Sequence, residues 1–68
     1  MAYVNEKGEK IFVSEGLQPG QWMAMRLAKN GYSKHRVKSP ALPIRAKLED
    51  AQADLDAYAA RRGWRVVE

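Results

Sequence analysis

The stretch from residue 21 to residue 38, QWMAMRLAKNGYSKHRVK, decides the fold of this chain. Residues 21–28 and 32–38 are two β-prone runs, and Lys29, Asn30 and Gly31 lie between them. An Asn-Gly pair supplies the positive φ angles that a tight hairpin turn requires. The stretch therefore predicts an antiparallel hairpin at the centre of the chain.

The segments on either side of this hairpin also have a readable pattern. Residues 2–13 hold two short β-prone runs around a polar turn at Gly8, which predicts a first hairpin. Residues 14–20 carry two glycines and a proline, so we expect an irregular loop there. Residues 1–20 are thus predicted to be an N-terminal hairpin with its loop, and residues 21–38 a second, basic hairpin. Prolines at positions 40 and 43 end that hairpin, because proline cannot donate a hydrogen bond to a sheet.

The last third of the chain changes to a helical pattern. Within residues 44–62 an apolar stripe repeats at spacings of three and four, which predicts a helix that begins near Ile44 or Lys47. The stripe consists of Leu48, Ala51, Leu55, Tyr58 and Ala59. Acidic residues in the first turn and arginines in the last complement the helix dipole, and Gly63 stands where a left-handed C-terminal cap is expected. Residues 64–67 are β-prone and form either an edge strand or a cap on the core.

Together these elements predict an α+β fold in one domain, residues 1–68. A small antiparallel sheet of three or more strands packs against one C-terminal helix, with a possible short final strand. A chain of 68 residues has room for one hydrophobic core. With no cysteine, that core must hold the fold alone or with a partner chain, so the pattern leaves both a monomer and a homodimer open.

Composition also bounds the location of the protein. No apolar run approaches the roughly 20 residues that span a bilayer, so no membrane association is expected. Residues 1–10 carry charges of both signs and lack the apolar stretch of a secretory signal. We therefore expect a soluble, cytoplasmic protein.

Positive charge is concentrated in one part of the chain. The net charge is +4, but residues 21–47 contain seven basic residues and no acidic one. Basic side chains at this density are typical of a surface that meets a negatively charged partner, although they also keep an exposed strand soluble and unpaired.

Alternation along the central hairpin sorts its residues into two faces. We expect Met23, Met25 and Leu27 to face the core together with Val37, and the helix to cover them. The uncovered face would then be basic and aromatic, and together with the turn residue Lys29 it is the predicted nucleic-acid-binding surface. Its predicted members are Trp22, Arg26, Lys29, Tyr32, Lys34, Arg36 and Lys38. Lysine and arginine neutralise phosphates, and aromatic rings stack on bases and sugars. Double-stranded DNA is the expected partner, because a strand ribbon fits the major groove.

A family resemblance points the same way. The features that carry the resemblance are Trp22, Arg26, the Lys-Asn-Gly turn, the basic strand 34–38 and the alanine-rich helix that begins near Glu49. Through these features the chain resembles the three-stranded-sheet-plus-helix domains of the AP2 and phage-integrase arm-binding type. Those domains lay their sheet in the DNA major groove. The resemblance implies that Trp22, Arg26, Lys34 and Arg36 contact DNA from the sheet.

Residues suited to catalysis or metal binding are few. His35 is the single histidine, and at the inner face or its rim such a residue is most often structural. Asp50 and Asp54 lie one helical turn apart, where they form either a solvated face or a weak cation site. No glycine-rich phosphate loop occurs. We therefore expect a protein that is not an enzyme and has no metal or cofactor. The alternative function is a small protein-interaction module, an adaptor or inhibitor of mobile-element type, that uses the same face.

Overall fold

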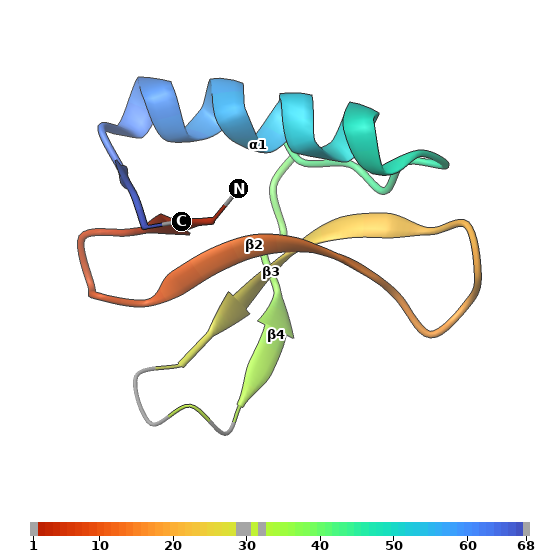
Figure 1. Cartoon of the computed structure of the whole chain (residues 1–68), viewed down its shortest axis with the longest axis horizontal. Helices are drawn as coiled ribbons and strands as arrows, with labels where there is room; N and C mark the ends of the chain where they lie inside the picture. Colours follow the sequence, from red (N-terminus) through yellow and green to blue (C-terminus); the bar gives the residue numbers. More distant parts are fainter. Residues whose placement is uncertain (1, 29–30, 32, 68) are drawn as a thin grey trace.

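One helix lies across one face of a five-stranded antiparallel sheet in this computed structural model, which describes residues 2–28, 31 and 33–67 (Figure 1). The elements are β1 (Tyr3–Val4), β2 (Lys10–Glu15), β3 (Trp22–Leu27), β4 (Lys34–Arg36), α1 (Leu48–Arg62) and β5 (Arg65–Val66). The strand order is β4-β3-β2-β1-β5, and each neighbouring pair is antiparallel. The predicted α+β fold is confirmed, and residues 65–66 form the short final strand.

The first hairpin, β1–β2, forms where the sequence predicts it. Gly8 has a φ of 80°, and its N–H donates to the carbonyl of Asn5 at 3.0 Å. The Asn5 side chain accepts hydrogen bonds from the N–H groups of Lys7 and Glu9, at 3.0 and 2.9 Å, and so closes the turn. After this turn β2 continues through Ser14 and Glu15, which pair with β3. The predicted loop therefore begins two residues later than expected, at Gly16.

The second hairpin, β3–β4, is antiparallel as predicted. Met25 stands opposite Arg36, and Leu27 opposite Lys34. β4 is shorter than residues 32–38, because the chain beyond Val37 turns toward the helix. Of the predicted turn, residues 29 and 30 lie outside the described residues, as does residue 32. Gly31 has a φ of 77°.

Helix α1 begins at Leu48, directly after its N-cap Lys47, so the expected start near Lys47 agrees with the structure and the start at Ile44 is wrong. The reason is that Arg45 belongs to the sheet, where it exchanges backbone hydrogen bonds of 2.7 and 2.9 Å with Trp22. The end is as predicted. Gly63 is left-handed, with a φ of 72°, and the N–H of Trp64 donates to Ala59 at 3.0 Å. Within the described ranges no helix is long and apolar enough to cross a membrane.

The core lies between α1 and the middle of the sheet. Ala51, Leu55 and Ala59 are buried on the helix, as the apolar stripe predicts, and Leu55 and Ala59 form one core cluster with Ile11 and Ala24. One member of the expected stripe behaves otherwise, and one residue outside it joins the core. Leu48, the first residue of the stripe, is 45% exposed. In contrast, Leu42, in the proline-rich connector, is only 2% exposed and completes the core.

The face of β3 that packs against α1 is the opposite of the predicted one. Residues paired across antiparallel strands share a face. Ala24 is buried, and the pairs Val13–Ala24 and Ile11–Arg26 therefore lie on the helix side, which we call the covered face. Met23, Met25 and Leu27 lie on the other face. Ala24 belongs to the sheet and faces the alanines of α1. Its small side chain allows a closer approach of helix and sheet than the long side chains of Met23, Met25 and Leu27 would allow.

Candidate functional site

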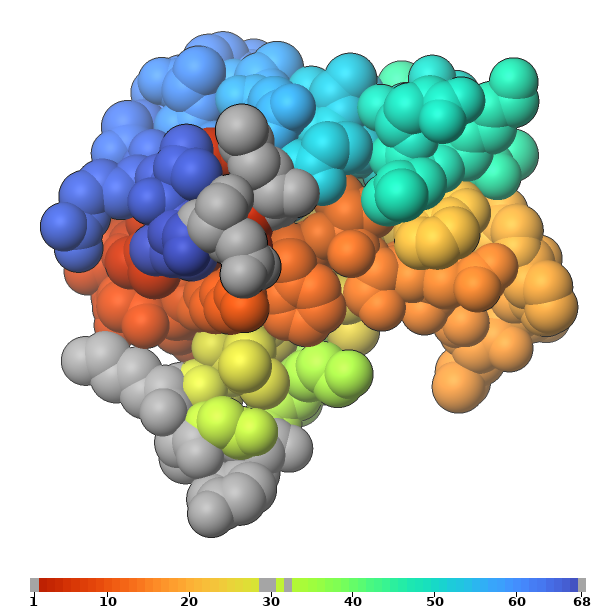
Figure 2. All heavy atoms as spheres, viewed as in Figure 1, coloured from red at the N-terminus to blue at the C-terminus, as the bar shows by residue number. Residues whose placement is uncertain are grey.

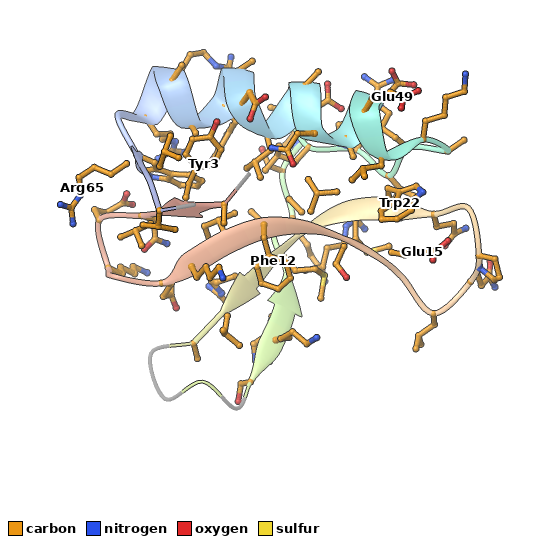
Figure 3. The ribbon with its side chains drawn as sticks, in the orientation of Figure 1. Tyr3, Phe12, Glu15, Trp22, Glu49 and Arg65 are labelled. Atoms are coloured by element: carbon orange, nitrogen blue, oxygen red, sulfur yellow. The ribbon has the colours of Figure 1, made fainter. Side chains whose placement is uncertain are left out.

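The face of the sheet opposite α1 is the first candidate site, and we call it the open face. Its described members come from β2, β3 and β4 and share the orientation away from the helix: Lys10, Phe12, Ser14, Met23, Met25, Leu27, Lys34 and Arg36. Figure 3 shows Phe12 on the side of β2 that points away from α1. Three of these side chains are cationic, four are large and apolar, and none is acidic. The surface can therefore make apolar contacts within a positive field.

The open face is hollowed beside the loop that joins β2 and β3. A groove of about 630 Å³ lies between this loop and β4, and its floor includes Met23 and Met25. The loop residue Leu17 lines one side of the groove and is fully exposed. Lys34 and Arg36 line the other side. Figure 2 shows the loop standing apart from β4 with the hollow between them. The groove therefore has an apolar floor and a cationic wall, and its lining also includes the carboxylate of Glu15, which accepts from the Gly20 N–H at 2.9 Å.

The structure separates the predicted binding residues into four groups, one of which is Lys38 alone, which follows β4 and lines a second groove described below. Lys34 and Arg36 lie on the open face, as predicted. Trp22 and Arg26 lie on the covered face, because β3 presents Ala24 to the helix and they alternate with Met23 and Met25. The prediction that they share a face with Lys34 is wrong. Lys29 and Tyr32 lie outside the described residues.

Trp22 and Arg26 have contacts of their own on the covered side. Trp22 is half-buried, and its backbone pairs with Arg45 at the start of the connector to α1. Figure 3 shows its ring on the side of the sheet toward α1. Arg26 Nε lies 3.8 Å from Glu9 Oε2. These positions make Trp22 part of the scaffold and leave Arg26 in a second groove.

This second groove lies on the covered side, between the C-terminal half of α1 and β4. We call it the helix-side groove. It has a volume of about 490 Å³ and is lined by Tyr58, Arg62 and Trp64 on one side and by His35 and Lys38 on the other. His35 belongs to the covered face but is exposed there, which places it at the rim.

An aromatic pair organises one wall of the helix-side groove. The rings of Tyr58 and Trp64 meet edge to face, with centroids 5.3 Å apart. Trp64 Nε1 donates to Glu6 Oε2 at 2.8 Å. The pKa of Glu6 is lowered, first by a hydrogen bond from its own backbone N–H and then by the bond from Trp64. The guanidinium of Arg62 lies over the Tyr58 ring, 5.0 Å from its centroid.

Two acidic residues of α1, Asp54 and Asp56, have structural partners. Arg45 donates to both carboxylate oxygens of Asp54, at 2.7 and 3.2 Å, and these bonds raise the pKa of the Arg45 guanidinium. Asp54 thus binds the connector to the helix. No group of three or more potential metal ligands occurs in the part of the chain that the structure describes.

Sequence reasoning missed the β2 half of the open face, namely Lys10 and Phe12. The signal was present, because Ile11 and Val13 are the β-branched residues of this strand and alternate with Phe12. Reading β2 and β3 as one antiparallel pair around the Gly16–Gly20 loop would have set Phe12 opposite Met25. Comparison with known proteins finds no matching family model, no matching curated protein and no matching solved structure.

Proposed function

We propose that this chain is a non-enzymatic nucleic-acid-binding domain whose open face contacts double-stranded DNA. The observation that supports the proposal is the charge of the two sides. Lys10, Lys34 and Arg36 stand on a sheet face that has no carboxylate among its described members, whereas the exposed side of α1 carries Glu49 and Asp50. Such a molecule has a positive side that attracts a polyanion and a negative side that repels it.

The apolar residues of the open face would also contact DNA in the proposed complex. Apolar side chains contact thymine methyl groups in the major groove, where arginine pairs with guanine by two hydrogen bonds. Phe12 and Met25 lie directly across from each other, and Met25 stands opposite Arg36. Two apolar side chains, Phe12 and Met25, and the guanidinium of Arg36 thus occupy neighbouring positions in one row across β2, β3 and β4. In this proposal Arg36 reads bases, and Lys10 and Lys34 neutralise phosphates.

The dimensions of the sheet are also suitable. Neighbouring strands lie about 4.8 Å apart, so β2, β3 and β4 together are roughly 10 Å wide. The major groove of B-DNA is about 12 Å wide and 8.5 Å deep. The helix, on the opposite face, would remain outside the groove.

Titration of a labelled duplex at about 50 and 200 mM salt tests the proposal. Each phosphate contact contributes about −0.9 to the slope of log K against log salt, so three contacts reduce affinity at least roughly 40-fold over this interval. The double variant Lys34→Glu with Arg36→Glu is expected to abolish binding. Lys47→Glu is the matched control, because Lys47 is exposed beside the start of α1 and lines neither groove. An absence of wild-type binding at the lower salt would rule the proposal out.

A second candidate, a protein-interaction module, is favoured by one specific observation. The open-face groove has an apolar floor of Met23 and Met25 with the fully exposed Leu17 beside it. Methionine-rich surfaces adapt to different partners, and the cationic wall would select an acidic one. Binding of this kind depends much less on salt than binding to phosphates, so the same titrations distinguish the two candidates.

A further inference from the structure

The helix-side groove carries an excess of positive charge that the open face does not use. Its lining includes the cations Lys7, Arg26, Arg36, Lys38 and Arg62, against the carboxylates of Glu6 and Glu9. Both carboxylates have donors within the protein. Glu6 accepts from Trp64 at 2.8 Å, and Glu9 accepts from Asn5 Nδ2 at 3.0 Å and lies 3.8 Å from Arg26.

Two cations of the groove, Lys38 and Arg62, form no ion pair with a described carboxylate, although the charge of Arg62 contributes to the lowered pKa of Glu6. No carboxylate lies within ion-pair distance of Lys38 or Arg62 among the residues for which the structure gives a description. Lys38 follows β4 in the chain, and Arg62 ends α1, so the two come from opposite walls of the groove. A chain of negative groups lying along the groove would meet both of them.

Arg62 is also held in place before any ligand arrives. Its guanidinium lies over Tyr58, Tyr58 packs against the edge of Trp64, and Trp64 is fixed by its hydrogen bond to Glu6. A cation over an aromatic ring keeps its hydrogen-bond donors available at the edge of the guanidinium plane. A side chain ordered in advance loses less entropy when it binds. Tyr58 and Trp64 thus act as positioning residues for Arg62.

The helix-side groove and the open face are continuous around the edge of the sheet. β4 is one of the two edge strands, and Arg36 lines both the groove on the open face and the helix-side groove. When a sheet face enters a DNA groove about 8.5 Å deep, the phosphate backbone stands as a wall beside the outermost strand. Groups just behind that strand then face phosphates.

We infer that the helix-side groove holds the sugar–phosphate backbone of the same nucleic acid, with Lys38 and Arg62 neutralising its phosphates from the far side of β4. This inference rests on the proposed function and extends it. The binding surface is a band that runs from Lys10 and Lys34 around the β4 edge, and not the open face alone. The sequence predicted that Lys38 binds phosphates from the uncovered face of the sheet. In this inference Lys38 keeps that role but acts from the helix-side groove.

The test compares the salt dependence of duplex binding for the wild type, Lys38→Gln, Arg62→Gln and the double variant, with Lys47→Gln as the matched control. Each single variant is expected to make the slope of log K against log salt shallower by about 0.9, and the double variant by about 1.8. Lys47→Gln is expected to leave the slope unchanged. Ethylation of the phosphates should interfere with wild-type binding at positions where it no longer matters to the double variant.

The possible outcomes separate the inference from the proposed function. If the double variant keeps the wild-type slope while Lys34→Glu with Arg36→Glu abolishes binding, the inference is wrong and the proposed function stands. If the wild type binds no duplex, both are wrong. Lys38→Gln changes an exposed residue outside the helices and strands, so its result remains decisive even if the double variant does not fold.

Discussion

At the scale of single residues, Tyr3 shows how a polar group is used inside this small core. The ring is 6% exposed, and its hydroxyl donates to Asp56 Oδ1 at 2.6 Å, which joins β1 to α1. This hydrogen bond, with burial and the Asp56 charge as smaller causes, raises the pKa of Tyr3 to about 12. The neutral phenol is therefore favoured in the folded state, and the contact favours folding while Tyr3 stays protonated.

We predict that Tyr3→Phe lowers the free energy of unfolding by about 1–3 kcal/mol at neutral pH, because a hydrogen bond to a charged group is lost. The difference should depend on pH. A free tyrosine has a pKa near 10, below the folded value, so the contribution is complete below about pH 10 and is lost as the pH rises toward 12. Urea denaturation of both proteins from pH 7 to 11.5 measures this. A gap that stays constant to pH 11.5 would show that the pKa of Tyr3 is not raised.

At the scale of the elements, helix α1 is held to the sheet by a narrow strip of side chains. Leu55 is fully buried between the flanking alanines 51 and 59, over the β2–β3 pair. The docking of the helix therefore depends strongly on one leucine.

Leu55→Ala is expected to lower the free energy of unfolding by about 2–5 kcal/mol, the usual range for a buried leucine that leaves a cavity. Leu48→Ala in the same helix is the matched control, and its cost should be small because Leu48 is 45% exposed. Thermal and chemical denaturation of the two variants measures the contrast. Equal losses would show that the helix packs on a different stripe.

The elements also show how far the sequence alone could lead. The helix was predictable from the spacing of Ala51 and Leu55 and from Gly63, because helical periodicity and a left-handed cap are local signals. The covered face of β3 was not. Alternation separates Ala24 from Met25, but which of them meets the helix depends on the volume available under α1, and this is set by residues far away in sequence. The prediction used hydrophobicity and not side-chain volume, and it therefore placed the methionines of β3 against the helix.

The candidate site was predictable to a similar extent. Lys34 and Arg36 were placed on the uncovered face correctly, because alternation in β4 needs no knowledge of its neighbours. The helix-side groove required knowledge that the C-terminal end of α1 and the end of β4 line one groove, a long-range arrangement that no local pattern contains. Its wall residues are Tyr58, Arg62 and Trp64. From the sequence, Tyr58 was interpreted as part of the apolar helix stripe, Arg62 as a charge that complements the helix dipole, and Trp64 as part of the terminal β-prone segment.

At the scale of the whole molecule, charge is divided between two sides. The N-terminal half of α1 carries most of the acidic residues of the last third of the chain, while the open face and the β4 edge carry cations. A polyanion that approaches in solution is therefore oriented toward the sheet before it makes contact. Under the proposed function, the four apolar side chains of the open face would make contact only after that encounter.

This order of events leads to a prediction that separates the two candidate partners. Met25 lies at the centre of the open face, across from Phe12 and Arg36. For a nucleic acid, Met25→Lys adds a cation where phosphates or base edges arrive, so duplex affinity at about 50 mM salt should rise and the salt slope should become steeper by about 0.9. For an apolar protein contact, a charge at the centre of the interface is left unpaired and binding should be lost.

The measurement is the duplex titration already described, with Met25→Leu as the control that conserves volume and charge. A lysine at this half-buried position can extend its ammonium group to water, so the fold should tolerate it, and a thermal melt verifies this. Tighter duplex binding by Met25→Lys, with Met25→Leu close to wild type, supports the nucleic-acid interface. Weaker duplex binding by a folded Met25→Lys would show that Met25 makes an apolar contact to the duplex that a lysine does not replace, and no measurable duplex binding by the wild type would leave the protein-interaction module as the candidate.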